Sequence, residues 1–250
     1  MSGHSKWATI KRKKGAADAK RGQVFTRLTR EIVMAAREGG GDVDSNFRLR
    51  LAIEKARSQN MPKENIERAM KRGTGESKEG EVFEQAYYEG YASHGVAVMI
   101  ECVTENRNRT VAEIRHALTR SGGSMAEAGA VGWQFRRAAV FSIVSEGQDF
   151  DKIFELAVEG GADDVTQDPE TIEIIAPVEN FKILSDRLRA AKIQPEDAGL
   201  RMLPNQEIEL DVDATLSVMR AIEYLEDLDD VLNVFSNLKI SEEAMTAMAA

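Results

Sequence analysis

The chain has 250 residues, an apolar content of 42%, a single cysteine and a formal net charge of −9. This length holds one large domain or two to three small ones, and the apolar content excludes a disordered protein. One cysteine excludes an intramolecular disulfide, and no apolar run reaches the roughly 18 residues that span a bilayer. The basic start lacks the apolar segment of a secretory signal, so we expect a cytoplasmic protein with no membrane partner.

The charge is divided unevenly along the chain. Residues 1–72 carry 18 Lys and Arg against 8 Asp and Glu, a net of +10, and the remainder carries 15 against 34, a net of −19. Such asymmetry indicates a basic binding module on an acidic body. The acidic part would repel phosphate everywhere except at the basic end.

Residues 1–20 form a basic arm with six Lys and Arg, one acid and the aromatic Trp7. The arm shows no helical or strand period that could bury a face, so we do not expect it to fold alone. Cations meet phosphates and an indole stacks on an unpaired base, which predicts contact with a polyanion. The alternative interpretation is a solvated, disordered N-terminus.

Three helices are expected next, over residues 23–38, from Asp44 or Ser45 to about residue 59, and from Pro62 to Gly73. The first is ended by three glycines, and proline suits the first position of the third. Their apolar residues recur at helical spacing and their other faces carry Arg and Lys. The pattern predicts a small three-helix bundle with basic outer faces.

The rest of the chain predicts two α/β domains, one inserted in the other. Strands at 83–91, 95–104 and 131–135, with a helix started by a Thr110–Glu113 capping box, lack a further strand. A tail of strand, helix and strand at 207–210, 213–227 and 231–236 supplies it, and the last ten residues are expected to fray.

The segment between these two parts predicts the ferredoxin-like order β-α-β-β-α-β. Its expected elements are strands at 139–145, 164–167, 171–176 and 200–203, and helices at 150–159 and 178–193. The predicted class is therefore α+β and multidomain, with an N-terminal three-helix bundle and two α/β domains. The predicted domain ranges are 1–80, then 81–137 with 205–250, and the inserted 138–204.

The candidate nucleic-acid contacts are the cations of the arm and bundle, together with one aromatic. They are Lys6, Trp7, Lys11, Arg12, Lys13, Lys14, Lys20, Arg21, Arg27, Arg30, Arg48, Arg50, Lys55, Arg57, Lys63, Arg68, Lys71 and Arg72. A second candidate is the polar run at 104–110, which contains Asn106, Arg107, Asn108 and Arg109. It predicts either a contact loop for phosphate or a partner carboxylate, or a simple loop with a helix cap.

No motif for catalysis or a cofactor is present, so we expect no enzyme, no cofactor and no metal. The glycine-rich stretch at 73–80 lacks the GxxxxGK pattern of a phosphate-binding loop. The acidic clusters at 163–170 and 226–230 lack the spacing of a calcium loop, which favours solvated turns and helix ends. A nucleophilic pair of Cys102 with His94 or His116 is not excluded by the sequence, but no local motif supports it.

Four long motifs closely resemble the YebC/PmpR family. They are GHSKWATIKRKKGAADAKRGQVFTRLTREI (3–32), NMPKENIERAMKRGTG (60–75), YYEGYASHGVAVMIECVTENRNRT (87–110) and YLEDLDDVLNVFSN (224–237). The resemblance covers nearly the whole chain in order. It implies a helical domain followed by two α/β domains, the third inserted in the second.

The resemblance also implies a non-enzymatic role in gene expression. Bacterial members are named transcriptional regulators that bind promoter DNA. The family also includes a mitochondrial translational activator, and a ribosome-associated role in relieving stalls at proline-rich sequences has been assigned to it. We therefore expect a DNA-binding regulator, with an rRNA- or ribosome-binding translation factor as the alternative. Nothing in the sequence requires a dimer, so a monomer is expected.

Overall fold

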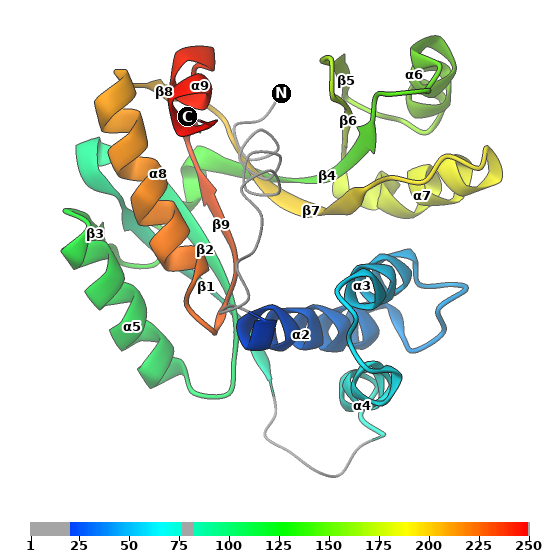
Figure 1. Ribbon diagram of the computed structural model, residues 1–250, viewed down its shortest axis with the longest axis horizontal. Helices are drawn as coiled ribbons and strands as arrows, with labels where there is room; N and C mark the ends of the chain where they lie inside the picture. The colour runs from blue at the N-terminus through cyan, green and yellow to red at the C-terminus, as the bar shows by residue number, and fades with distance from the viewer. Residues whose placement is uncertain (1–20, 77–82, 250) are drawn as a thin grey trace. The chain divides into compact units, whose positions relative to one another are not determined.

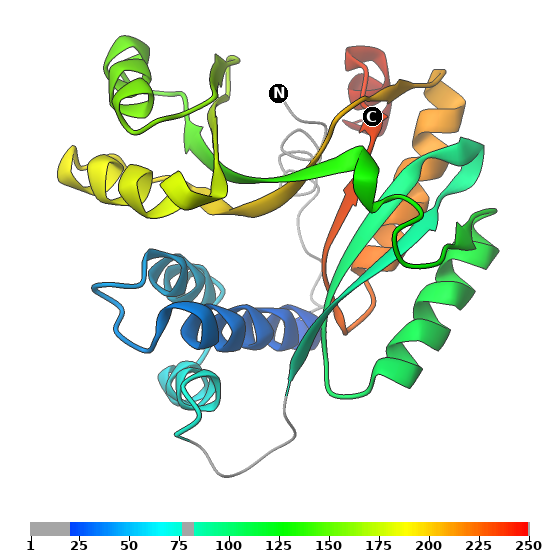
Figure 2. The same ribbon diagram turned by 180° about the vertical axis from the view of Figure 1, so that it is seen from behind.

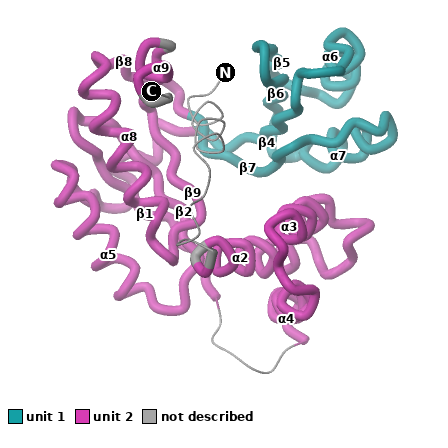
Figure 3. The backbone as a smooth tube through the Cα atoms, viewed as in Figure 1, with its two compact units in different colours: residues 1, 136–203 teal, residues 2–135, 204–250 magenta. Residues whose placement is uncertain are grey.

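The computed structural model describes residues 21–76 and 83–249, in which helices come first and mixed α/β elements follow (Figure 1). Two compact units are present among them, residues 136–203 and the remaining described residues (Figure 3). The expected α+β class, with N-terminal helices before the α/β parts, is confirmed. The three domain ranges stay a prediction, because the N-terminal helices fall in the same unit as the first sheet.

Hydrophobic side chains at helical spacing pack the N-terminal helices together. The helices are α2 (Arg21–Gly39), α3 (Phe47–Ser58) and α4 (Lys63–Gly73). Ile32 from α2, Leu49 from α3 and Ile66 from α4 meet in one buried cluster. Gly73 lets α4 approach α2 closely, since a Cβ at this position would lie 2.5 Å from the Val33 carbonyl oxygen. The packing of the bundle core therefore depends both on large apolar side chains and on the missing side chain of Gly73.

The start of α3 differs from the prediction, because Asn46 rather than Asp44 or Ser45 is the cap. The Asn46 Oδ1 accepts from the Leu49 amide at 3.0 Å, while its Nδ2 donates to Ala35 O at 2.7 Å and Gly40 O at 2.8 Å. Only an amide side chain can accept and donate in this way. Pro62 also lies one position earlier than expected, at the N-cap of α4.

Replacing Asn46 by Ala should destabilise the protein by about 2–3 kcal/mol, measured by urea unfolding. The variant loses a helix cap and leaves a buried carbonyl without its donor. Ser45→Ala is the matched control, because that exposed hydroxyl contacts only Asp42, through its carbonyl at 3.3 Å and its carboxylate, and the change should alter stability by less than about 0.5 kcal/mol. Equal losses of stability in the two variants would contradict the assignment of Asn46 as the cap in place of Ser45.

The larger unit contains a four-stranded sheet in the order β3-β1-β2-β9. Its strands are β1 (Glu84–Tyr91), β2 (Ala97–Thr104), β3 (Ser124–Met125) and β9 (Val231–Ser236). Each neighbouring pair in it is antiparallel. The C-terminal strand β9 joins the sheet as predicted, and its neighbour is β2. Helices α5 (Arg107–Arg120) and α8 (Val212–Glu226) cover one face (Figure 2).

Alternation along β2 distributes side chains between two cores, as expected for a strand with both faces covered. Ile100 and Cys102 face the cluster formed with α5 and α8. Val103 instead joins the cluster of the N-terminal bundle, together with Phe83 and Leu232. The second of these cores is therefore formed jointly by the bundle and the sheet.

The smaller unit has the predicted order β-α-β-β-α-β. Its elements are β4 (Phe135–Val144), α6 (Phe150–Glu159), β5 (Asp164–Gln167), β6 (Thr171–Ala176), α7 (Phe181–Ala190) and β7 (Asp197–Pro204). The strands lie in the order β5-β6-β4-β7. Phe141 of β4 stacks on Phe181 of α7 at 5.1 Å between ring centroids, inside the core of the unit.

Several elements differ from their predictions in type, length or sheet. The strand expected at 131–135 is a 3-10 turn, η3 (Gly132–Gln134), that leads directly into β4. The strand expected at 207–210 is the short β8 (Ile208–Glu209), which pairs in parallel with β10 (Leu238–Lys239) in a separate sheet. The C-terminal residues expected to fray include helix α9 (Glu242–Ala249), held by the buried Ala244 in the same core as α8.

Candidate nucleic-acid interface

The arm candidates cannot be placed. Lys6, Trp7, Lys11, Arg12, Lys13, Lys14 and Lys20 lie outside the described residues. Arg21 begins α2, and only its backbone is described. The structural account of the candidate interface therefore concerns the bundle.

Two of the predicted bundle contacts turn inward, which corrects their assignment. Arg30 is only 6% exposed, and its Nη2 donates to the buried Asp230 at 2.7 Å. Arg72 lies with its guanidinium 4.6 Å from the ring centroid of Phe83 and reaches Glu105 at 3.8 Å. These arginines hold the junction between the bundle and the sheet, so they are not free to meet phosphate.

Other cations are directed to backbone or acidic groups of the same unit. Arg27 donates to the Glu226 carbonyl, and Arg50 donates to the carbonyls of Val43 and Asp44 at 2.8–3.1 Å. Arg48 pairs with Glu38, Lys55 with Glu31 at 3.5 Å and Lys63 with Glu67 at 3.6 Å. Both lysine side chains are exposed, so these pairs contribute little and Lys55 and Lys63 remain accessible to a ligand.

Three predicted contacts are exposed, and their side chains have no ion-pair or hydrogen-bond partner among the described residues. They are Arg57 in the last turn of α3 and Arg68 and Lys71 on α4. Glu64 and Glu67 are also exposed on α4, beside Arg68 and Lys71. Their negative charges partly offset the positive charge of this surface. The described bundle thus offers a small cationic surface whose residue types suit phosphate contact.

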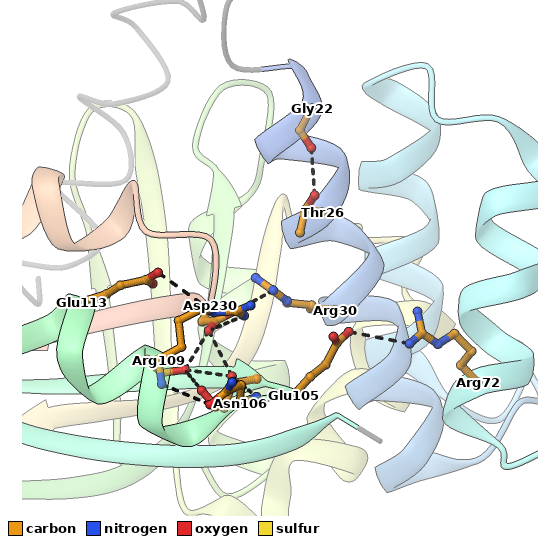
Figure 4. Close-up of polar contacts among 11 residues, drawn as sticks. Gly22, Thr26, Arg30, Arg72, Glu105, Asn106, Arg109, Glu113 and Asp230 are labelled. Atoms are coloured by element: carbon orange, nitrogen blue, oxygen red, sulfur yellow. Dashed lines mark hydrogen bonds and ion pairs between the residues drawn. The ribbon is translucent and has the colours of Figure 1, made fainter. Parts of the chain in front are cut away.

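Asp230 is the centre of the junction between bundle and sheet (Figure 4). It lies directly before β9 and is 1% exposed. Its Oδ1 accepts from Arg30 Nη2 at 2.7 Å and Arg109 Nη2 at 2.9 Å, and its Oδ2 accepts from Thr104 Oγ1 at 3.0 Å and Thr110 Oγ1 at 2.7 Å. We call these five residues the Asp230 cluster.

The polar run at 104–110 contains a helix cap, which was one of its two predicted interpretations. Asn106 caps α5 by accepting from the Arg109 amide at 3.1 Å, so Arg107, Asn108 and Arg109 belong to the helix. Thr110 is buried within α5, which makes the predicted Thr110–Glu113 capping box wrong. Arg107 donates to Glu84 at 2.7 Å, and Arg109 is bound to Asp230. The carboxylates that these arginines bind lie in the same chain.

Burial and charge act in opposite directions in the Asp230 cluster. Burial raises the pKa of Asp230, but hydrogen bonds from Thr110 and Arg109, the charge of Arg30 and the Thr104 hydroxyl outweigh it and hold this pKa below its ordinary value. Burial lowers the pKa of Arg30, with partial compensation by Asp230. The hydrogen bond to Asp230 raises the pKa of Arg109. The cluster joins one buried carboxylate to the buried guanidinium of Arg30 and to the half-exposed guanidinium of Arg109.

Sequence reasoning missed the role of Asp230, which was assigned to a solvated acidic cluster. Its partners Arg30 and Thr104 lie 200 and 126 positions away, so no local spacing reveals them. One signal was available: a threonine ends a wholly buried strand, and an arginine and a second threonine follow it within a short polar run. Such polar groups at the end of a buried strand need partners, and a buried Asp can supply them.

The described residues offer little for catalysis. Cys102 is fully buried in the sheet core, which raises the pKa of its thiol, while His94 and His116 are exposed, so the Cys–His pair is excluded. Among residues 21–76 and 83–249, no group of three or more His, Cys, Asp or Glu could hold a metal ion. No helix in this part of the chain is both long and apolar enough to cross a membrane.

Comparisons with known proteins cover almost the entire chain. The family model for the TACO1/YebC protein N-terminal domain matches residues 5–76, and that for the TACO1/YebC second and third domain matches residues 83–238. A "probable transcriptional regulatory protein" of Geobacter sulfurreducens is 49% identical over 98% of both chains. A protein of the same description from Geotalea uraniireducens is 47% identical over 99% of this chain and all of its own. The crystal structure of a conserved hypothetical protein from Aquifex aeolicus has a TM-score of 0.80 at 40% identity, covering 90% of this chain and 93% of its own.

Proposed function

Because the chain belongs to the TACO1/YebC family, as its motifs predicted, we propose that it is a non-enzymatic, nucleic-acid-binding regulator of gene expression. The description of its relatives as probable transcriptional regulatory proteins supports the regulatory role. We further propose that it acts in the cytoplasm as a monomer, with DNA as its ligand.

The separation of charge along the chain carries this proposal. A basic segment of net +10 precedes a body of net −19, so a polyanion is attracted to one end of the sequence and repelled by the rest. Arg57, Arg68 and Lys71 present exposed charges in the basic segment, and the arm supplies six more cations. We assign the arm and these three residues to the contact, and remove Arg30 and Arg72 from it.

Two features favour the alternative ligand, RNA, over DNA. The exposed bundle contacts are Arg and Lys, which bind backbone phosphates, whereas reading of base edges usually uses Asn, Gln or bidentate Arg from a recognition helix. Trp7 adds an indole, which stacks on an unpaired base more readily than on a closed duplex. These features support the alternative of an rRNA-binding translation factor.

Crosslinking in cells followed by sequencing of the bound nucleic acid distinguishes the two ligands. Enrichment at promoters supports the transcriptional role and contradicts the ribosomal one. Enrichment at ribosomal RNA without promoter signal supports the ribosomal role and contradicts the transcriptional one. If no nucleic acid is enriched above a crosslinked control lacking the protein, the proposed function itself is wrong.

A further inference from the structure

The turn between α3 and α4 presents two amide side chains to solvent. It covers residues 59–62 and joins two helices of the bundle (Figure 1). Gln59 and Asn60 are both exposed, and neither side chain has a hydrogen-bond partner in the part of the chain that the structure describes. Ser58 differs, because its hydroxyl donates to the Lys55 carbonyl at 2.8 Å and so belongs to the end of α3. The two amides therefore keep their donors and acceptors available at the surface.

Backbone hydrogen bonds hold Asn60 in a defined position. Its φ is 59°, in the left-handed region. The Asn60 amide donates to the Arg57 carbonyl and the Met61 amide donates to the Ala56 carbonyl, both at 2.9 Å, which closes the end of α3. Met61 is then only 5% exposed and packs in the bundle core. The side chain of Asn60 thus projects from a turn that is anchored on both sides.

The left-handed backbone by itself does not require an amide at this position. Glycine adopts this conformation most readily and is the commonest residue just after a helix, and asparagine is the second choice. Four other helices of the described chain, α2, α4, α5 and α6, are followed by glycines in the left-handed conformation. They are Gly40, Gly75, Gly122 and Gly161, with φ of 75–82°. At the end of α3 the chain instead carries an amide that no described contact of the fold uses.

Cations flank the turn on both sides. Arg57, assigned to the phosphate contact, lies on its α3 side, and the side chains of Lys55 and Lys63 are 57% and 84% exposed. Glu54 and Glu64 adjoin the same stretch, so its net charge is small. Because an amide is neutral, its hydrogen bonds to a base do not depend on this balance of charge. The exposed cations can contact the backbone phosphates on either side of such a base.

From the anchored turn and its unused amide, we propose that Asn60 hydrogen-bonds to the edge of an unpaired adenine in the bound nucleic acid, an inference that rests on the proposed function. A side-chain amide donates and accepts side by side, and adenine offers the matching donor at N6 and acceptor at N7. The asparagine side chain is short and comes from a turn, so it suits a base that is free to leave its stack and face the protein. Asn60 thus gives a surface of phosphate-binding cations a preference for one base.

Fluorescence anisotropy with labelled oligonucleotides tests the proposal. The probes are an oligouridine 12-mer, the same 12-mer with two central adenines, and the corresponding oligothymidine pair made as DNA. The parent should bind the adenine-containing probe at least about fivefold more tightly than its partner, and a preference within only one pair identifies the nucleic acid that is read. Asn60→Gly should bind both members of each pair equally, because glycine keeps the left-handed backbone and removes the amide. Since no charge is lost, the salt dependence on the oligouridine probe should stay unchanged in this variant.

His94→Gly is the matched control, since His94 is also exposed and has a φ of 60°. It should keep the adenine preference of the parent, and both glycine variants should melt within about 2 °C of the parent. An adenine preference that is equal in the parent and in Asn60→Gly would overturn the proposal, because the asparagine would then serve only the backbone of the turn. Equal binding of all probes by the parent would also overturn it, while leaving the proposed function in place. If the parent binds none of the probes, the reading of an unpaired base is wrong, and crosslinking in cells decides the proposed function independently.

Discussion

Asp230→Ala should lower the free energy of unfolding by about 3–5 kcal/mol, the largest stability loss expected from a single substitution at the junction. The substitution leaves the buried Arg30 guanidinium without its carboxylate, and removing one partner of a buried pair costs far more than the pair contributes. Thr104 and Thr110 also lose a shared acceptor inside the protein. Urea unfolding followed by circular dichroism measures the loss.

The neighbouring Asp229 provides the control for this experiment. Asp229 is exposed, so Asp229→Ala should change stability by less than about 0.5 kcal/mol. The double substitution Arg30→Met with Asp230→Leu should recover much of the loss, because it removes both buried charges at similar volume. A loss in Asp230→Ala no larger than in Asp229→Ala would show that the Asp230 cluster does not hold the junction.

The contribution of Asp230 to stability depends on pH with a defined sign. The pKa of Asp230 is below its ordinary value of about 3.9, so its contribution is fully present above that value and is lost as pH falls through the lower, folded pKa. The stability difference between the parent and Asp230→Asn should therefore be constant above about pH 5 and shrink below about pH 4.

Local periodicity predicted most elements because each is determined by neighbours in sequence. The limits of β9, Val231–Ser236, and of α6, Phe150–Glu159, were predicted to the residue, since a compact apolar strand and an amphipathic helix give clear signals. The starts of α3 and α5 were misplaced. In both cases an asparagine caps the helix where Asp44 or Ser45, and Thr110, were expected.

The candidate interface was predicted less well for a physical reason. Arginine on a helix face usually reaches solvent, so charge alone assigned Arg30 to ligand contact. Its true partner Asp230 lies at the start of a strand 200 positions later, and only the fold brings the two together. Arg57 and Lys71 have no partner from a distant part of the sequence, and they are exposed as the helical period predicts. Prediction from sequence therefore failed where the burial of a charge depended on distant residues.

Deletion of residues 1–20 should cause the largest decrease in nucleic-acid affinity and a shallower salt dependence. The segment contains six of the 18 cations in the basic module. Removing one cation that neutralises a phosphate reduces the slope of log Kobs against log salt by about 0.9 on duplex DNA and about 0.7 on single strands. If all six cations neutralise phosphates, the slope falls by about 5 on duplex DNA, and anisotropy titrations at several salt concentrations measure it.

A variant of the bundle cations distinguishes the contribution of the arm to binding from that of the bundle. Replacing Arg57, Arg68 and Lys71 together by Gln removes three exposed charges without touching the Asp230 cluster, and should reduce the slope by no more than about 3. Trp7→Ala should cost about 1–3 kcal/mol on a single strand and little on a duplex if the indole stacks on unpaired bases. An unchanged slope after the deletion, with a reduced slope in the triple variant, would transfer the contact from the arm to the bundle. Because affinity and slope are measured on both ligands, the same titrations show which polyanion the basic module prefers.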